Sequence, residues 1–211
     1  MRRIVAHTAA FVFAVIVTSA GHAQVDLREP AGKEWITVGG DWHNTRYSTL
    51  TQIDRNNVKD LKAAWVVHLR SGLGQKYSME GTPIVADGIM YIATGNDDVY
   101  ALDAKTGALI WEHKSGIDQA INTVCCGWDN RGVAVGEGKV FVGQLDGTFV
   151  ALDAKTGNLL WQTLIGKWQD GYTITAAPLY YKGAIYTGIS GGDREARGKL
   201  TALDAKTGKE L

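Results

Sequence analysis

The heptapeptide ALDAKTG occurs three times, and this repeat constrains the fold more than any other feature of the sequence. The copies span residues 101–107, 151–157 and 202–208, so the period is 50 and then 51 residues. In each copy the Asp and Thr side chains can satisfy backbone donors of a turn, and the closing Gly can adopt a positive φ. Trp111 and Trp161 follow the first two copies, each four residues after the Gly. The repeat therefore predicts a strand, a turn and a second strand that carries Trp.

Short apolar runs before the first two repeats complete a unit of four strands. The runs are Ile84-Val85, Met90–Ala93, Val133–Val135 and Val140–Val142, and the turns between them are Asp87-Gly88, 96–98, Glu137-Gly138 and Asp146-Gly147. Four short strands in about fifty residues are typical of a β-propeller blade, with a stacked solenoid or an ordinary sandwich as the alternatives. The sequence predicts an all-β fold made of propeller blades.

The segment from Trp35 to Trp65 is less regular. We expect an entry segment and first-blade strands there, with one helical turn in NNVKDL capped by Asn56. Three blades expose an unpaired sheet edge and cannot close a ring. We therefore expect residues 24–211 to be the N-terminal part of a propeller that continues beyond Leu211.

The first 23 residues have the pattern of a secretory signal peptide. Arg2 and Arg3 precede an uncharged run over residues 9–17, and Gly21 and Ala23 are small residues suited to signal peptidase. The apolar run is too short to span a bilayer, and no later segment is long and apolar enough to do so. We predict that residues 1–23 are removed and that the mature chain is periplasmic, without a transmembrane segment.

The charged residues balance, since 22 Lys and Arg stand against 22 Asp and Glu. Nothing in this bulk charge favours a nucleic acid or an anionic membrane as partner. Function must therefore come from local motifs.

The third repeat departs from the spacing of the other two. Tyr91 precedes Ala101 by 10 residues and Phe141 precedes Ala151 by 10, but Tyr186 precedes Ala202 by 16. The six extra residues lie in GISGGDREARG, residues 188–198, between the second and third strands of the third blade. Such a glycine-rich loop can bring backbone amides and a carboxylate close to a ligand, although a solvated surface loop has the same composition.

Cys125 and Cys126 are the only cysteines. Adjacent cysteines can bridge only through a strained ring, because their Cα atoms lie closer than ordinary disulfide geometry prefers. A zinc site is disfavoured, since the five histidines are scattered and there is no second cysteine pair. If the ring forms, it closes no long loop and instead offers a flat, rigid surface.

Together these motifs resemble the pyrroloquinoline quinone (PQQ)-dependent alcohol dehydrogenases of the methanol and ethanol type, from about Trp35 to the end of the chain. The resemblance implies an eight-bladed propeller with a Cys125–Cys126 disulfide against the quinone. CCGWDNRG, residues 125–132, implies that Arg131 hydrogen-bonds the quinone oxygens. MEGTPIV, residues 79–85, and TITAAP, residues 173–178, imply that Glu80 and Thr175 also contact the cofactor.

The resemblance also assigns the inserted loop. Ser190, Gly191 and Gly192 would line the cofactor, and Asp193 would replace the family's metal-binding glutamate beside a calcium or lanthanide ion. Asp is one methylene shorter than Glu, so the loop must move inward or coordination must become monodentate. Glu195 is a less favoured substitute.

The reaction implied by the resemblance is oxidation of a primary alcohol, with hydride passing to the quinone and electrons leaving to a cytochrome c. The family's catalytic base would lie beyond Leu211, so we expect this stretch alone not to oxidise alcohols. One rival is a non-catalytic propeller scaffold with the same repeats, which Cys125, Cys126, Arg131 and the insertion argue against. A second rival, a membrane-bound quinoprotein sugar dehydrogenase, is disfavoured by the cysteine pair and the lack of transmembrane helices.

Overall fold

The computed structural model describes residues 26–72 and 76–211, and the predicted signal peptide lies outside this part of the chain. The first sheet contains β1 (Ile84–Ala86), β2 (Ile89–Ala93), β3 (Val99–Asp103) and β4 (Leu109–His113). The second contains β5 (Ala134–Gly136), β6 (Lys139–Gly143), β7 (Thr148–Asp153) and β8 (Leu159–Leu164). The third contains β9 (Leu179–Tyr181), β10 (Ala184–Gly188) and β11 (Leu200–Asp204).

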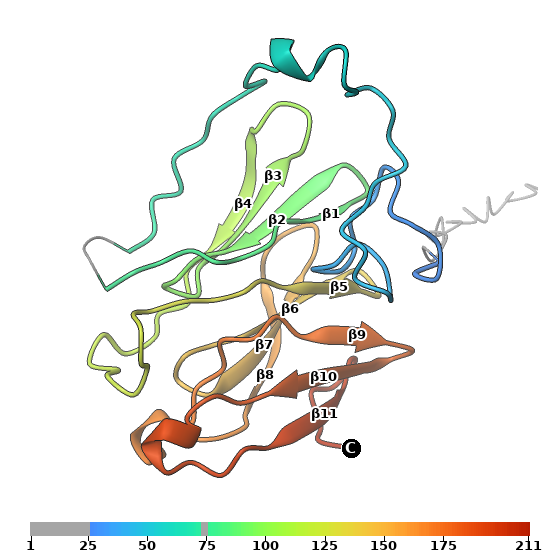
Figure 1. Ribbon diagram of the computed structural model, residues 1–211. Helices are drawn as coiled ribbons and strands as arrows, with labels where there is room; N and C mark the ends of the chain where they lie inside the picture. The colour runs from blue at the N-terminus through green and yellow to red at the C-terminus, as the bar shows by residue number, and fades with distance from the viewer. Residues whose placement is uncertain (1–25, 73–75) are drawn as a thin grey trace, which may run out of the picture.

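In each sheet, neighbours in sequence are antiparallel neighbours in space. The first strands β1, β5 and β9 approach one another, and the later strands fan outward from them (Figure 1). This is the arrangement of consecutive propeller blades, so the predicted all-β propeller fold is confirmed for the described part of the chain. No helix in residues 26–72 and 76–211 has the length and apolar character needed to cross a bilayer.

The ALDAKTG turns form as the sequence predicts. Oδ1 of Asp153 accepts hydrogen bonds from the backbone N–H groups of Lys155 and Thr156 and from the Thr156 hydroxyl. Gly157 has a φ of +73° and donates its N–H to the Asp153 carbonyl. Asp103 and Asp204 make the same contacts in the other two copies. At Asp103, the hydrogen bond from the Thr106 hydroxyl holds the pKa of the carboxyl below its usual range.

Each Trp that follows a repeat packs against the repeat of the next blade. Trp111 donates its indole N–H to the carbonyl of Ala154 at 3.0 Å, and its ring covers Gly157. Trp161 makes the equivalent contacts with Ala205 and Gly208 in the third blade. These two tryptophans therefore fill the space between neighbouring blades.

Trp65 belongs to the same series. Its indole N–H lies 3.3 Å from the carbonyl of Ala104, and its ring covers Gly107 of the first repeat. Val67 and Leu69 alternate with exposed residues and pack on the same side of the first blade. The segment around Trp65 thus packs against the first blade in the way that β4, which carries Trp111, packs against the second blade.

The region from residue 26 to residue 72 differs from expectation. It forms isolated bridges, such as Trp35 with Val85, in place of the predicted first-blade strands. A single 3₁₀ turn, η1 (Val58–Asp60), appears where one helical turn was expected. Asn56 does not cap it: Asn57 is at the N-cap position, and the carboxylate of Asp54 accepts the backbone N–H groups of both asparagines.

We predict that Gly157→Ala destabilises the protein more than Gly138→Ala. Both glycines have a positive φ, +73° and +69°, so both variants carry the same backbone strain. A Cβ on Gly157 would lie 2.6 Å from the Trp111 ring, whereas a Cβ on Gly138 would meet nothing within 4 Å. The difference in unfolding free energy, measured by urea denaturation, should be about 1–3 kcal/mol because the added methyl group overpacks the blade contact. Equal losses in the two variants would contradict this account of blade docking.

Candidate cofactor site

The predicted motifs gather at one end of the sheets. In antiparallel blades the turn between the second and third strands lies at the same end as the connection to the next blade, and we call this the site end. Backbone hydrogen bonds join the connections there: Thr82 N–H donates to the Arg131 carbonyl, Arg131 N–H to Thr175, and Ser190 N–H to Thr173. The segments containing Glu80, Arg131, Thr175 and Ser190 are therefore brought together, as the resemblance implies.

Arg131 is held between two carboxylates. Its Nη2 donates to Glu80 Oε2 at 2.9 Å, and its Nη1 lies 3.2 Å from Asp129 Oδ2. The backbone N–H of Glu80 donates to Asp129 Oδ1 at 3.1 Å, so Asp129 fixes both partners. Burial raises the pKa of Asp129, and the charge of Arg131 opposes that rise. The Arg131 side chain keeps 49% of its surface exposed, which leaves donors free for a ligand.

Two hydroxyl groups extend this arrangement. Thr175 Oγ1 and Ser190 Oγ lie 2.8 Å apart in a partly buried position. Thr173, whose backbone pairs with Ser190, has a buried hydroxyl with no hydrogen-bond partner among the described residues. The site therefore offers a cation and several hydroxyl donors, a set suited to an anionic, oxygen-rich ligand.

Cys125 and Cys126 form a disulfide, and both residues are exposed. The bonded pair leads into Trp128, whose backbone N–H donates to the Lys76 carbonyl at 2.5 Å and whose carbonyl accepts the Ser78 N–H at 2.8 Å. Lys76 Nζ lies 3.8 Å from the centre of the Trp128 ring. Trp128 therefore anchors the disulfide loop to the connection that precedes β1.

The inserted loop forms where predicted, between β10 and β11, and contains η3 (Gly192–Arg194). Gly191 is buried with a φ of +118°, and a Cβ there would lie 1.9 Å from the Gly171 carbonyl oxygen. Glycine is thus required at position 191, because a side chain there would overlap the β8–β9 connection. The sequence did not reveal this requirement. Gly192 has open space around it.

Among the described residues, no hydrogen bond or ion pair joins the Asp193 side chain to another predicted site residue. The Asp193 side chain is 61% exposed, and its ion-pair contact is with Arg194 Nε at 3.9 Å. In the part of the chain that the structure describes, no group of three or more His, Cys, Asp or Glu side chains could hold a metal ion. The assignment of Asp193 as a metal ligand stays a prediction.

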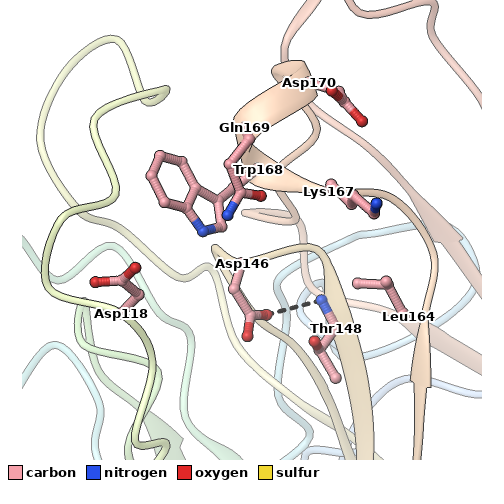
Figure 2. Close-up of a pocket in the computed structure, with 8 residues that line it drawn as sticks. All are labelled: Asp118, Asp146, Thr148, Leu164, Lys167, Trp168, Gln169 and Asp170. Atoms are coloured by element: carbon pink, nitrogen blue, oxygen red, sulfur yellow. Dashed lines mark hydrogen bonds between the residues drawn. The ribbon is translucent and has the colours of Figure 1, made fainter.

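A separate pocket of about 520 Å³ also opens between the connections (Figure 2). It is lined by Asp118, Asp146, Thr148, Leu164, Lys167, Trp168, Gln169 and Asp170. Asp146 turns back to accept the Thr148 N–H at 2.8 Å. None of the predicted cofactor residues lines this pocket, so it is distinct from the candidate site.

The blades, the exposed vicinal disulfide and the paired arginine in the same β4–β5 connection define a propeller of the quinoprotein class. The family model described as "PQQ: Glucose/ethanol/alcohol dehydrogenase, beta-propeller domain" matches residues 35–211. The chain belongs to this family.

Similar proteins include the quinohemoprotein alcohol dehydrogenase of Comamonas testosteroni, 44% identical over 178 residues that make up 83% of this chain and 25% of that protein. The crystal structure of that enzyme matches with a TM-score of 0.78, covering 84% of this chain and 26% of that one. The 1-butanol dehydrogenase (cytochrome c) of Thauera butanivorans is 45% identical over 82% of this chain and 25% of its own length. A europium-containing methanol dehydrogenase matches with 37% identity and a TM-score of 0.79, covering 88% of this chain and 32% of that one. The chain thus spans about a quarter to a third of the proteins it matches.

We predict that the Cys125–Cys126 bond is quantitatively formed in protein purified without reductant. Intact-mass measurement after alkylation without reductant should show no added label, and the same treatment after reduction should show two. The Cys126→Ser variant should take one label without reductant, which controls for access of the reagent. Two labels on the unreduced protein, or a disulfide-linked dimer, would contradict the assignment.

Proposed function

We propose that this chain forms part of a periplasmic quinoprotein that binds PQQ at the site end and oxidises a primary alcohol to an aldehyde. The observation that carries the proposal is the half-exposed guanidinium of Arg131, fixed by Glu80 and Asp129. Arg131 lies in the β4–β5 connection, which also holds the exposed vicinal disulfide. The names of the similar proteins, quinohemoprotein alcohol dehydrogenase and 1-butanol dehydrogenase (cytochrome c), support the same chemistry.

The residues present fit this cofactor. PQQ is a flat quinone that carries carboxylate groups, so it needs a cation, hydroxyl donors and a flat apolar surface. Arg131 supplies the cation, while Thr175 and Ser190 supply hydroxyls that now pair with each other at 2.8 Å. The exposed sulfur atoms of Cys125 and Cys126 supply a rigid surface.

When bound, PQQ supplies the acceptor for the hydride that leaves the alcohol carbon, while the hydroxyl proton passes to a base. Arg131 would donate N–H groups to the quinone oxygens and so would stabilise negative charge there. Glu80 keeps the guanidinium in place through the 2.9 Å contact. Thr175 and Ser190 orient the cofactor carboxylates. The catalytic base is proposed to come from outside these residues.

Three finer assignments belong to the same proposal. Gly191 and Gly192 would let the inserted loop approach the cofactor edge, and Asp193 would hold a calcium or lanthanide ion, which would supply a Lewis acid. The electron acceptor would be a cytochrome c. The signal peptide predicted for residues 1–23 directs the protein to the periplasm.

The test of this function uses the full protein reconstituted with PQQ and calcium. It should bind PQQ and oxidise ethanol or 1-butanol in a dye-linked assay, and Arg131→Ala should weaken PQQ binding by about 10- to 100-fold because a charged hydrogen bond is worth about 1.5–3 kcal/mol. Arg55→Ala, in the exposed entry segment, is the matched control and should bind as the parent does. The proposal fails if the parent protein binds no PQQ.

A further prediction concerns the metal. Asp193→Ala should abolish stoichiometric calcium binding in the PQQ-loaded protein, as measured by atomic emission after dialysis, while the melting temperature changes little because the side chain is exposed. Asp193→Glu should retain or increase metal affinity, since it restores the family's reach. Glu195→Ala is the control and should keep its metal. Retention of metal by Asp193→Ala would transfer the assignment to Glu195.

A further inference from the structure

Asp97 is a buried acid whose side chain crosses from one blade to the next. It lies in the β2–β3 turn, has a φ of +58° and is 0% exposed. Its Oδ1 accepts a hydrogen bond from Asn130 Nδ2 at 2.8 Å, and its Oδ2 accepts the backbone N–H of Leu145 at 2.6 Å. The first partner lies in the β4–β5 connection and the second in the β6–β7 turn. The carboxyl group therefore ties the first blade to two segments of the second at the site end.

Asn130 uses its amide fully. Nδ2 donates to the Gly143 carbonyl at 2.9 Å as well as to Asp97, and Oδ1 accepts the Gly132 N–H at 3.0 Å. A reversed amide would point its oxygen at the Asp97 carboxylate and at the Gly143 carbonyl, both of which are acceptors. Asp97 and the Gly143 carbonyl, together with the Gly132 N–H, thus set which way the Asn130 amide faces, and Asp97 is the one side chain among these partners.

Arg131 lies between the two residues that this network fixes. Asn130 is held on one side, and on the other Gly132 has a φ of +130° with its N–H bound to Asn130 Oδ1. A Cβ on Gly132 would lie 3.1 Å from the Thr82 carbonyl oxygen, so the turn is also closely packed. The direction in which the Arg131 side chain leaves the backbone follows from this turn.

We propose that Asp97 is a positioning residue for Arg131: through Asn130 it fixes the Asn130–Gly132 turn and so directs the guanidinium toward the cofactor. The inference rests on the proposed function, because it assigns Arg131 to PQQ.

The surroundings of Asp97 explain why a carboxyl group is needed. No described cation forms an ion pair with it, and the nearby acids Asp98 and Asp146 oppose its ionisation. Burial is the largest cause that raises the pKa of Asp97 well above its usual range, and the donors from Asn130 and Leu145 act against this. What the side chain contributes is two acceptor oxygens facing two N–H donors. An amide side chain at position 97 would offer one acceptor oxygen, and its own N–H groups would face one of these two donors.

The test is the dissociation constant of PQQ for the full protein, measured by equilibrium dialysis at fixed calcium. Asp97→Asn should weaken PQQ binding about tenfold or more, because the Asn130 amide loses its fixed orientation. The matched control is Asp98→Asn. Asp98 is 2% exposed in the same turn, but its carboxylate accepts from Ser71, Lys114 and Ser115, away from Asn130. Asp98→Asn should lower stability and leave PQQ affinity within about twofold of the parent.

A double-mutant cycle separates positioning from general destabilisation. If Asp97 acts through Arg131, then Asp97→Asn has no further effect on PQQ affinity once Arg131→Ala is present. Two results would overturn the inference. One is a double variant in which the two losses of PQQ affinity multiply, and the other is an Asp97→Asn variant with the parental affinity. If Asp97→Asn does not fold, Asp97→Ala makes the same test, since it removes the acceptors without adding a buried donor.

Hydrogen exchange of the cofactor-free protein gives a readout that does not depend on PQQ. The Gly132 N–H should exchange about tenfold faster in Asp97→Asn and at the parental rate in Asp98→Asn, because only the first variant releases the Asn130 amide. Unchanged exchange at Gly132 would overturn the inference by itself. Absence of PQQ binding by the parent protein, together with faster exchange in Asp97→Asn, would instead count against the proposed function alone.

Discussion

The stacking of one blade on the next depends on a repeated contact between a tryptophan ring and a glycine. Trp111 covers Gly157 and donates its indole N–H to the Ala154 carbonyl, and Trp161 repeats this on the third blade. The contact needs a residue that combines a positive φ with no side chain, because a Cβ would overlap the ring atoms. The indole supplies a large apolar surface and a directed donor in the same group, so it sets both the distance and the orientation of the neighbouring blade.

That stacking brings distant segments together at the site end. Once the first strands β1, β5 and β9 lie side by side, the connections that precede them become neighbours (Figure 1). The backbone hydrogen bonds from Thr82 to Arg131 and from Arg131 to Thr175 then join three connections into one surface. A functional group on any one connection is positioned by the other two.

The acidic residues of the site end fall into two groups with different physical roles. Asp97, Asp98 and Asp129 are buried and accept hydrogen bonds from backbone or side-chain donors of other segments, so they hold those segments in place. Asp193 is exposed and makes one weak contact, and this leaves its carboxylate available to a ligand. The pocket in Figure 2 contains further acids but none of the residues that hold Arg131.

The sequence by itself determined the features that depend on near neighbours. The Asp-Thr-Gly turn, the alternation of short strands and the position of the inserted loop are all local, because each rests on hydrogen bonds or periodicity within a few residues. The residues grouped at the site, such as Glu80 and Arg131, could also be named from the sequence, but only through resemblance to a family.

The tertiary structure alone decided the contacts between residues far apart in the chain. It showed that Trp65 covers Gly107 and that a side chain at position 191 would overlap Gly171. It also showed that Asp97 pairs with Asn130. In the sequence, Asp97 looked like any turn residue, since nothing local marks a carboxyl that will be buried against another blade. The physical reason is that burial and hydrogen-bond partners of this kind exist only after the blades have stacked, and local propensity carries no information about that packing.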